Sequence, residues 1–154
     1  MGDQSCELPL SNTNEREMDE ILASARTIAV VGLSEKPDRE SHAVARYLQA
    51  NGYRIIPVNP AVSEVLGERS YADLPSIPPE IKIDVVDIFR KPEFIPAVVD
   101  AAIARGARSV WMQLGLAHNA AAEKARAAGL KVVMDRCMKV EHARWSAHRP
   151  PSRA

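Results

Sequence analysis

The sequence predicts an α/β fold with an open, mostly parallel five-stranded sheet and helices on both faces. Two observations support this prediction. Short apolar runs recur along the chain, and segments with apolar residues at helical spacing alternate with them. Strands that alternate with helices in this way form parallel units with right-handed crossovers.

The composition fits one globular domain. A chain of 154 residues is long enough to bury a single core. Its 20 Lys and Arg residues balance its 20 Asp and Glu residues, so we expect neither nucleic acid nor a membrane as a partner. No apolar run approaches the ~18 residues of a membrane span, and the polar first residues do not resemble a signal peptide. We therefore expect a soluble, cytoplasmic protein.

Three segments are expected along the chain. Residues 1–13 lack periodicity and are predicted to be a mobile N-terminal extension, residues 14–146 form the folded domain, and residues 147–154 form a basic C-terminal tail. Asn14 and Glu17 have the form of a capping box. An amphipathic helix is therefore predicted to lead into the first strand.

The predicted strands follow from the apolar runs. The first run is apolar at every position from 28 to 31, which suits a strand buried on both faces at the centre of the sheet. Residues 61–79 are too irregular for a crossover helix, so we expect short turns there. The strands cover residues 27–31, 53–58, 83–88, 109–114 and 130–134.

The segments between the later strands are predicted helices. One begins at Ser41, and another begins at Pro92, because proline suits the first turn of a helix. An alanine-rich helix follows the fourth strand, and Asp135 is expected to cap the last helix. The three crossover helices each stop at a glycine, namely Gly52, Gly106 and Gly129.

The fold class predicts where a ligand binds. In an open parallel sheet, ligands bind outside the carboxyl ends of the strands, where the strand order reverses. This rule selects four loops, which follow Val31, Val58, Ile88 and Leu114. All candidate site residues come from these loops and the helix starts that follow them.

The first loop contains the main candidates. Gly32 lets the backbone turn tightly, and Ser34 offers a hydroxyl. Lys36 and Arg39 offer positive charge, and Ser41 stands at the helix entrance, where free N–H groups attract anions. Together these residues suit a pyrophosphate. The alternative is that the serines only cap the helix while the charges stay solvated.

The second loop, Asn59-Pro60, argues against a standard dinucleotide site. Such a site has the pattern Gly-x-Gly-x-x-Gly after the first strand and an acidic residue after the second to hold the ribose hydroxyls. The first loop has one glycine, and Asn59 stands where the acid would be. Both differences weaken the case for a nicotinamide cofactor. Pro60 suggests an apolar wall against a base or ribose, and a simple turn proline is an equal alternative.

The third loop places an aromatic ring and two cations beside a helix start. Phe89 could flank an adenine while Arg90 or Lys91 meets another phosphate. The alternative makes Phe89 a core residue and Lys91 a solvated charge. Tyr71, in the connection after the second strand, supports a weaker version of the same interpretation.

The fourth loop begins at Gln113 and Gly115. Gln113 emerges from an otherwise apolar strand and needs a partner, either a ligand or the backbone. His118 precedes an alanine-rich helix, where a cap is the more common role than a catalytic base. His142 beside Glu141 is expected to be exposed. No Ser/His/Asp group and no Cys/His spacing for a metal can be assembled, so no catalytic residue or metal ligand is predicted.

Cys137 allows two interpretations. It follows Asp135-Arg136 at the predicted opening of a helix, where the helix end and a cation could activate a thiol. The preferred interpretation is a small buried residue that packs the last helix on the sheet. Cys6 is the only other cysteine, so neither a disulfide framework nor a zinc cluster is expected.

Several short blocks, taken in order and spacing, resemble a known family. They are Val30-Val31-Gly32-Leu33-Ser34, Arg39 with Ser41, Gly52-Tyr53, Pro57-Val58-Asn59-Pro60, Val86-Asp87-Ile88-Phe89-Arg90, Val110-Trp111-Met112-Gln113-Leu114-Gly115 and Met134-Asp135-Arg136-Cys137. The chain resembles the CoA-binding domain family, specifically its small stand-alone bacterial members of the YccU type, over about residues 21–144. The family looks like the nucleotide-binding domain at the start of the succinyl-CoA synthetase alpha subunit, a Rossmann-like fold that binds CoA through its ADP part.

The resemblance implies a set of ligand contacts. Gly32, Leu33 and Ser34 would approach the diphosphate, with Arg39 and Ser41 beside it. The other loops would supply Asn59 and Pro60 near the ribose or adenine, and Phe89, Arg90 and Pro92 on the other side. The synthetases carry a phosphorylated histidine in a later domain that this sequence lacks. The resemblance therefore implies ligand binding rather than a ligase reaction.

We expect a small protein that binds coenzyme A or an acyl-CoA through its ADP moiety, as a non-catalytic binding or regulatory protein. An NAD(P)-dependent oxidoreductase of similar fold is the alternative, and the missing glycines and acid argue against it. A third interpretation is a scaffold subunit that presents the nucleotide site to a partner. No particular protein partner is predicted.

Overall fold

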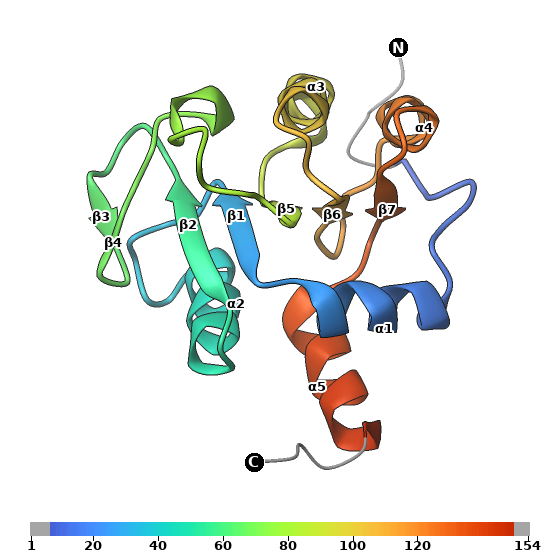
Figure 1. Cartoon of the computed structure of the whole chain (residues 1–154), viewed down its shortest axis with the longest axis horizontal. Coiled ribbons are helices and arrows are strands. Elements are labelled where there is room, and N and C mark those ends of the chain that lie inside the picture. Colours follow the sequence, from blue (N-terminus) through green and yellow to red (C-terminus); the bar gives the residue numbers. More distant parts are fainter. Residues whose placement is uncertain (1–6, 150–154) are drawn as a thin grey trace.

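Figure 1 shows the computed structural model of the chain, which describes residues 7–149. A five-stranded sheet forms its centre, with the strands in the order β2-β1-β5-β6-β7. Every neighbouring pair in this sheet is parallel, so the predicted α/β class and parallel arrangement are confirmed. The strands are β1 (Thr27–Val31), β2 (Arg54–Val58), β5 (Val85–Ile88), β6 (Ser109–Met112) and β7 (Lys131–Val133).

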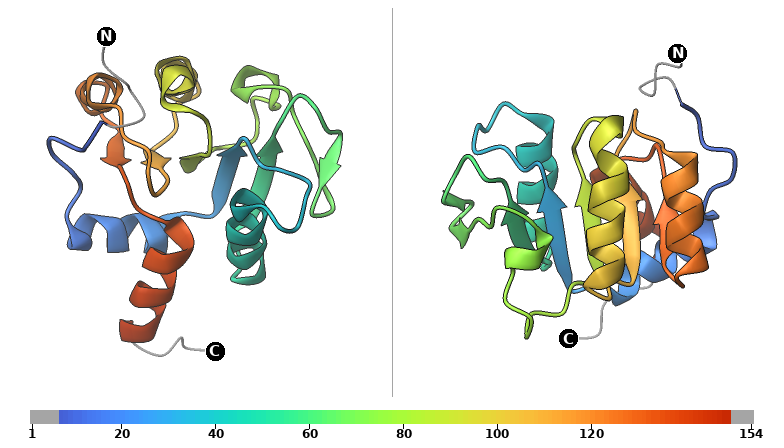
Figure 2. Two further views of the ribbon diagram at one scale, coloured as in Figure 1. Left: turned by 180° about the vertical axis from the view of Figure 1, so that it is seen from behind. Right: turned by 90° about the horizontal axis from the view of Figure 1, so that it is seen from above.

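Helices cover both faces of the sheet, as Figures 1 and 2 show. One face packs against α1 (Glu15–Ser24), α2 (Glu40–Ala50) and α5 (Met138–His148), and the other packs against α3 (Ile95–Ala104) and α4 (Asn119–Ala127). Successive strand residues alternate between the two cores: Ile28 and Val30 of β1 lie in the first core, and Ala29 lies in the second. Because both faces are covered, the strands are almost wholly apolar.

The connection between β2 and β5 lacks a crossover helix, as predicted, but it has more structure than turns. Strands β3 (Glu64–Val65) and β4 (Glu68–Arg69) form an antiparallel hairpin, and a 3₁₀ helix follows at Leu74–Ser76. Arg105, at the end of α3, holds the rest of the connection. Its guanidinium donates hydrogen bonds of 2.6, 2.8, 3.1 and 3.2 Å to the carbonyls of Leu74, Ile77, Pro78 and Ile81.

The predicted cap at Asp135 is wrong. This residue has a φ of 57°, and its Oδ1 accepts a hydrogen bond of 2.7 Å from the Gly115 N–H. The last helix begins later, with Cys137 at the N-cap position. Asp135 joins the loops after β6 and β7, which lie together because these two strands are neighbours. The same loops shorten the predicted strands, so Leu114 and Met134 lie beyond the ends of β6 and β7.

The prediction that His142 is exposed is also wrong. The residue is 2% exposed, because α5 packs against both α1 and α2 and buries more of its surface than a one-sided helix would. Its Nδ1 lies 2.9 Å from the hydroxyl oxygen of Tyr47. Burial lowers the pKa of His142, and the charge of Arg149 lowers it further. The ring makes edge contacts with Tyr47, Tyr53 and Trp145.

The described part of the predicted N-terminal extension, residues 7–13, lies beside the end of the sheet at β7. The Asn12 amide pairs with both backbone groups of Met134, at 2.8 and 3.0 Å. The Thr13 hydroxyl donates a hydrogen bond to the Val132 carbonyl. Residues 12 and 13 are therefore docked on the domain.

Some predictions concern residues outside the described range. Residues 1–6 include Cys6, and residues 150–154 contain the end of the predicted basic tail. The mobility of residues 1–6 and the assignment of residues 150–154 to a basic tail stay predictions. Within residues 7–149, no helix combines the length and the apolar character that crossing a membrane requires.

Candidate functional site

The candidate site lies where the strand order reverses. β2 pairs on one side of β1 and β5 pairs on the other, so the chain leaves β1 in one direction and later returns on the opposite side. The loops after β1 and β5 are therefore adjacent at the carboxyl edge of the sheet. The four loops selected from the sequence follow β2, β1, β5 and β6, which are consecutive strands of the sheet.

Gly32 lets two of these loops approach each other. Its φ is 87°, and its N–H donates a hydrogen bond of 2.9 Å to the Val58 carbonyl. A Cβ at this position would lie 2.7 Å from the backbone oxygen of Phe89 and 3.2 Å from Cδ of Arg90. Only glycine therefore allows the loop after β1 to pack against the loop after β5.

Two serine hydroxyls organise the loop after β1. The Ser34 N–H donates a hydrogen bond of 3.0 Å to Oγ of Ser41, and the Lys36 N–H donates one of 3.1 Å to Oγ of Ser34. Both hydroxyls act here as acceptors, so each retains its O–H as a donor. If the serines only capped the helix, as the alternative interpretation has it, the O–H donors of Ser34 and Ser41 would have no acceptor assigned to them.

The N-terminus of α2 opens onto the same loop. Arg39, at the N-cap position, makes no capping hydrogen bond with its side chain, so the first-turn N–H groups have no side-chain acceptor there. The helix dipole and the exposed Lys36 and Arg39 favour an anion, whereas Glu40 and the exposed loop acids Glu35 and Asp38 oppose one. We call this space of about 440 Å³ the anion hollow; it is lined by Gly32, Ser34, Lys36, Arg39, Glu40, Ser41 and Phe89.

Leu33 and Asn59 support the loop from inside. The Leu33 side chain is fully buried, so only its backbone can meet a ligand. Nδ2 of Asn59 donates a hydrogen bond of 2.9 Å to the Leu33 carbonyl, and its Oδ1 accepts one of 2.9 Å from the Ala61 N–H. Both ends of the Asn59 amide are therefore engaged in joining the loops after β1 and β2.

A smaller apolar hollow lies between the loop after β2, the connection near the 3₁₀ helix, and α3. We call it the Pro60 hollow, and its volume is about 160 Å³. Pro60 and Arg90 line it together, so the predicted apolar wall stands beside a cation. The other side chains of its lining include Val31, Val58, Leu74 and Val98.

A third hollow, of about 280 Å³, separates the loop after β5 from the loop after β6. We call it the Leu114 hollow. Glu40 and Phe89 line both this space and the anion hollow, so the two spaces adjoin. The remaining lining residues are Arg90, Lys91, Pro92, Gln113, Leu114 and Leu116. The carboxyl edge thus has a groove that passes from an anion-attracting end to a more apolar end.

Arg90 lines both the Pro60 hollow and the Leu114 hollow. Its guanidinium carbon lies 4.2 Å from the centre of the Phe94 ring, a stacked cation–π arrangement. Among residues 7–149, no acidic side chain forms a salt bridge with it. A stacked guanidinium without a counter-ion is suited to accept a phosphate.

Gln113 is satisfied at one end only. The residue is 3% exposed, and its Oε1 accepts a hydrogen bond of 3.1 Å from the Met138 N–H. The partner predicted for Gln113 is therefore the backbone at this end. Its Nε2 is buried and has no hydrogen-bond partner among the described residues, and the same holds for Nδ1 of His42 and both carboxyl oxygens of Asp87.

Asp87 is a buried acid next to the site that is absent from the predicted site residues. It lies in β5 between Val30 of β1 and Trp111 of β6, and it is fully buried. Burial raises the pKa of its carboxyl well above the usual range, so the neutral acid is favoured. An isolated acid within an apolar run was the signal in the sequence.

Residues 26–143 match the family described as the CoA binding domain. The chain belongs to this family. The resemblance drawn from the sequence is thus confirmed at the family level. The chain is also 41% identical over 134 residues to the uncharacterized protein YneT of Bacillus subtilis (strain 168), a match that covers 87% of this chain and 98% of YneT.

Two solved structures are similar to this CoA-binding domain along almost their whole length. Prb, described as the PH1109 protein redesigned for binding, is 40% identical with a TM-score of 0.86, and the match covers 92% of this chain and 98% of Prb. A hypothetical protein from Pyrococcus horikoshii OT3 is 40% identical with a TM-score of 0.84, over 95% of this chain and 99% of that one.

Two side chains with catalytic potential serve the fold of this CoA-binding domain. His118 is the N-cap of α4, and its Nδ1 accepts a hydrogen bond of 3.1 Å from the Ala121 N–H, as the cap interpretation predicts. Cys137 is buried at the N-cap of α5 and packs in the core there, as the preferred interpretation predicts. Within residues 7–149, no three His, Cys, Asp or Glu side chains are grouped so that they could hold a metal ion.

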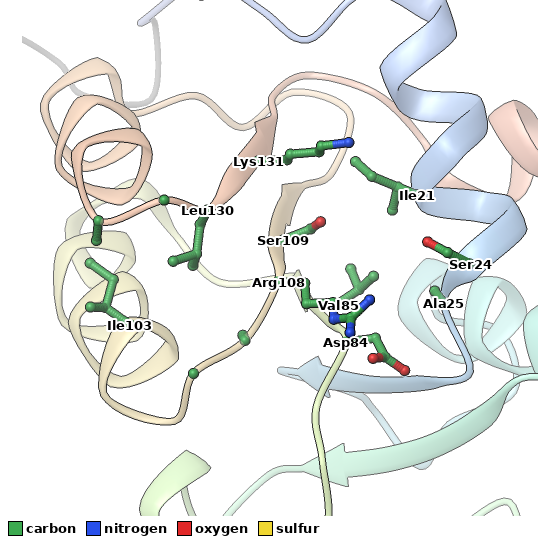
Figure 3. Close-up of a pocket in the computed structure, with 14 residues that line it drawn as sticks. Ile21, Ser24, Ala25, Asp84, Val85, Ile103, Arg108, Ser109, Leu130 and Lys131 are labelled. Carbon is green, nitrogen blue, oxygen red and sulfur yellow. The ribbon is translucent and has the colours of Figure 1, made fainter.

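A hollow of about 460 Å³ lies at the opposite, amino edge of the sheet (Figure 3). We call it the amino-edge hollow. Residues at the starts of β5, β6 and β7 and at the ends of α1, α3 and α4 line it, among them Ser24, Asp84, Arg108, Ser109 and Lys131. Helix C-termini carry partial negative charge, so they disfavour the anion that the start of α2 attracts. None of the predicted site residues lies in this hollow.

Proposed function

We propose that this protein binds coenzyme A or an acyl-CoA through its ADP moiety, as a non-catalytic binding or regulatory protein. The anion hollow is the observation that carries the proposal. Two serine hydroxyls, the uncapped start of α2 and the exposed cations Lys36 and Arg39 meet there in one space. A diphosphate uses all of these donors. Membership of the CoA-binding domain family supports CoA as the molecule that carries it.

The hollows at the carboxyl edge suggest where each part of the ADP moiety binds. In this proposal the diphosphate lies in the anion hollow, over Gly32 and the first turn of α2. The adenine lies against the apolar walls of the Pro60 hollow. Arg90, which borders that hollow without a salt-bridge partner among the described residues, meets the phosphate on the ribose.

The loop after β2 favours CoA over NAD or NADP in this proposal. A dinucleotide site holds the ribose hydroxyls with an acidic side chain at this position. The chain has Asn59 there, and both ends of its amide already bond to the Leu33 carbonyl and the Ala61 N–H. Asn59 therefore positions the neighbouring loop and has little capacity left for a ribose.

Thermal unfolding with single ligands tests the proposal. Samples would contain CoA, acetyl-CoA, NAD, NADP or ATP. A ligand at ~100 times its Kd adds ~2.7 kcal/mol to the free energy of unfolding, which for a domain of this size raises Tm by about 5–10 °C. We expect this rise with CoA and acetyl-CoA. A rise with NAD or NADP and none with CoA would reverse the assignment in favour of the oxidoreductase-like alternative.

A further inference from the structure

The Leu114 hollow is the part of the groove that the ADP moiety leaves free in the proposed arrangement. It meets the anion hollow at Glu40 and Phe89, so a ligand chain that leaves the diphosphate can pass Phe89 into it. Pro92 is buried, whereas Leu114 exposes 63% of its surface at this hollow. Leu114 therefore offers aliphatic surface that an apolar ligand group would cover.

Gln113 gives this hollow one buried polar group. Its Oε1 is fixed by the Met138 N–H, so the orientation of the amide follows from the hydrogen bond and Nε2 is the donor end. That donor has no acceptor among the described residues. A buried N–H without an acceptor destabilises the free protein, so a ligand that brings a carbonyl oxygen gains affinity.

We propose that the Leu114 hollow holds the acyl-thioester end of the ligand, and that the preferred ligand is an acyl-CoA with a short aliphatic chain rather than free CoA. Gln113 donates a hydrogen bond to the thioester carbonyl, and the acyl chain lies against Pro92, Leu114 and Leu116. The inference rests on the proposed function and adds the chemical class of the acyl group.

Two cations at this hollow define the rival class of ligand. Lys91 is exposed at its rim, and Arg90 also lines it. They would suit an acyl group that ends in a carboxylate. In the proposed arrangement Arg90 meets the phosphate on the ribose, and Glu40 lies at the junction with the anion hollow. We therefore favour the uncharged chain, and butyryl-CoA and succinyl-CoA separate the two classes because their acyl groups have the same number of carbons.

Isothermal titration calorimetry of the full chain with CoA, acetyl-CoA, butyryl-CoA and succinyl-CoA tests the inference. We expect Kd to fall about fivefold from CoA to acetyl-CoA, as one hydrogen bond provides. It should fall about fivefold again from acetyl-CoA to butyryl-CoA, because two methylenes become partly buried. Succinyl-CoA should bind more weakly than butyryl-CoA.

The outcomes separate this inference from the proposed function. Equal Kd values for CoA, acetyl-CoA and butyryl-CoA would overturn the acyl site while CoA binding stands. Tighter binding of succinyl-CoA than of butyryl-CoA would overturn the aliphatic class. If none of the four ligands binds, the proposed function itself is wrong.

Two variants divide the acyl site into its polar and apolar parts. Gln113→Glu keeps an oxygen for the Met138 N–H and replaces the free donor, so the preference for acetyl-CoA over CoA should fall from about fivefold to about one. Leu114→Ser should remove most of the gain from acetyl-CoA to butyryl-CoA. Leu8→Ser is the matched control, because Leu8 is 72% exposed and lies outside the groove.

The Gln113→Glu variant also tests whether the Gln113 amide of the parent protein points into the Leu114 hollow. Circular dichroism would show whether the variant is folded. An unchanged preference in the folded variant would mean that Nε2 is satisfied inside the protein, and would overturn the role of Gln113. If the variant does not fold, the ligand series on the parent chain and on Leu114→Ser still decides the inference.

Discussion

The two edges of the sheet differ in what their backbone and side chains offer to a ligand. At the carboxyl edge, the start of α2 and two serine hydroxyls face the anion hollow. At the amino edge, the ends of α3 and α4 border the hollow of Figure 3. Two charged side chains there are engaged, since Lys131 pairs with Glu20 at 3.0 Å and Asp84 accepts the N–H groups of Arg26 and Thr27.

The volume of a hollow therefore does not identify the site in this protein. The two spaces have similar volumes, about 440 Å³ for the anion hollow and about 460 Å³ for the amino-edge hollow. The direction of the helix dipoles separates them. Three pairs of substitutions, each with one member near the carboxyl edge and one near the amino edge, test whether the two edges differ in this way.

The largest effect is expected from glycine substitutions. Gly32→Ala should lower the free energy of unfolding by about 3 kcal/mol, because the new Cβ meets the Phe89 oxygen and the φ is left-handed. Gly129, at the amino edge, shares the positive φ, but nothing lies within 4 Å of an added Cβ there. Gly129→Ala should therefore lower the free energy of unfolding by only about 1 kcal/mol. Urea unfolding measures both, and equal losses would contradict the close packing of the two loops.

The next effect is on ligand affinity. Arg39→Ala should weaken CoA binding by about tenfold or slightly more, since one charge-assisted phosphate contact is lost. Because Arg39 is exposed, the stability of the unliganded protein should change little. Lys131→Ala removes a cation at the amino edge and should leave CoA affinity unchanged. Calorimetric titration compares the two, and equal effects of both substitutions would move the phosphate site away from the anion hollow.

The smallest effect concerns pH and the two acids of the β5 region. The folded-state pKa of Asp87 is raised by burial, so the native protein keeps a proton that the unfolded chain releases. The stability that this proton provides is complete below the unfolded pKa of ~3.9 and is lost as the pH rises toward the folded pKa. Asp87→Asn should remove this loss and make the protein more stable than the parent at pH 7.

Asp84→Asn is the control for this prediction. Asp84 accepts two backbone N–H groups with one oxygen, and the asparagine amide retains an oxygen for them. The variant should therefore keep the decline in stability with pH that Asp87 causes. Urea unfolding between pH 5 and pH 8 measures both variants. If the stability of the parent protein changed with pH over this range in the same way as that of Asp87→Asn, the assigned role of the buried acid would be contradicted.

Features encoded by continuous stretches of sequence were predictable. The apolar run of β1, the glycine after it and the helix that begins near Ser41 follow one another directly, so their geometry follows from local rules. For the same reason, the residues expected at an anion, among them Ser34 and Arg39, do line one hollow. Glycine stops and the cap at His118 are local signals of the same kind.

Features that depend on strand order were not predictable from one sequence. The bonds from Asn59 to the loop after β1 and from Asp135 to Gly115 join residues that become neighbours only once the sheet is assembled. Arg105 and its four carbonyl partners follow the same pattern. The burial of His142 was not predicted for another reason. Helix α5 contacts two other helices, so more of the surface of α5 is buried than an amphipathic pattern indicates.

The docking of Asn12 and Thr13 beside β7 bears on how copies of this protein can associate. These two side chains occupy backbone groups of β7 and of the residue that follows it. At the other margin of the sheet, Tyr71 forms a parallel bridge with Val58 of β2. A bare outer strand is a template for pairing with a foreign strand and for aggregation. Side chains and a bridge therefore occupy part of each margin, which disfavours extension of the sheet at these positions.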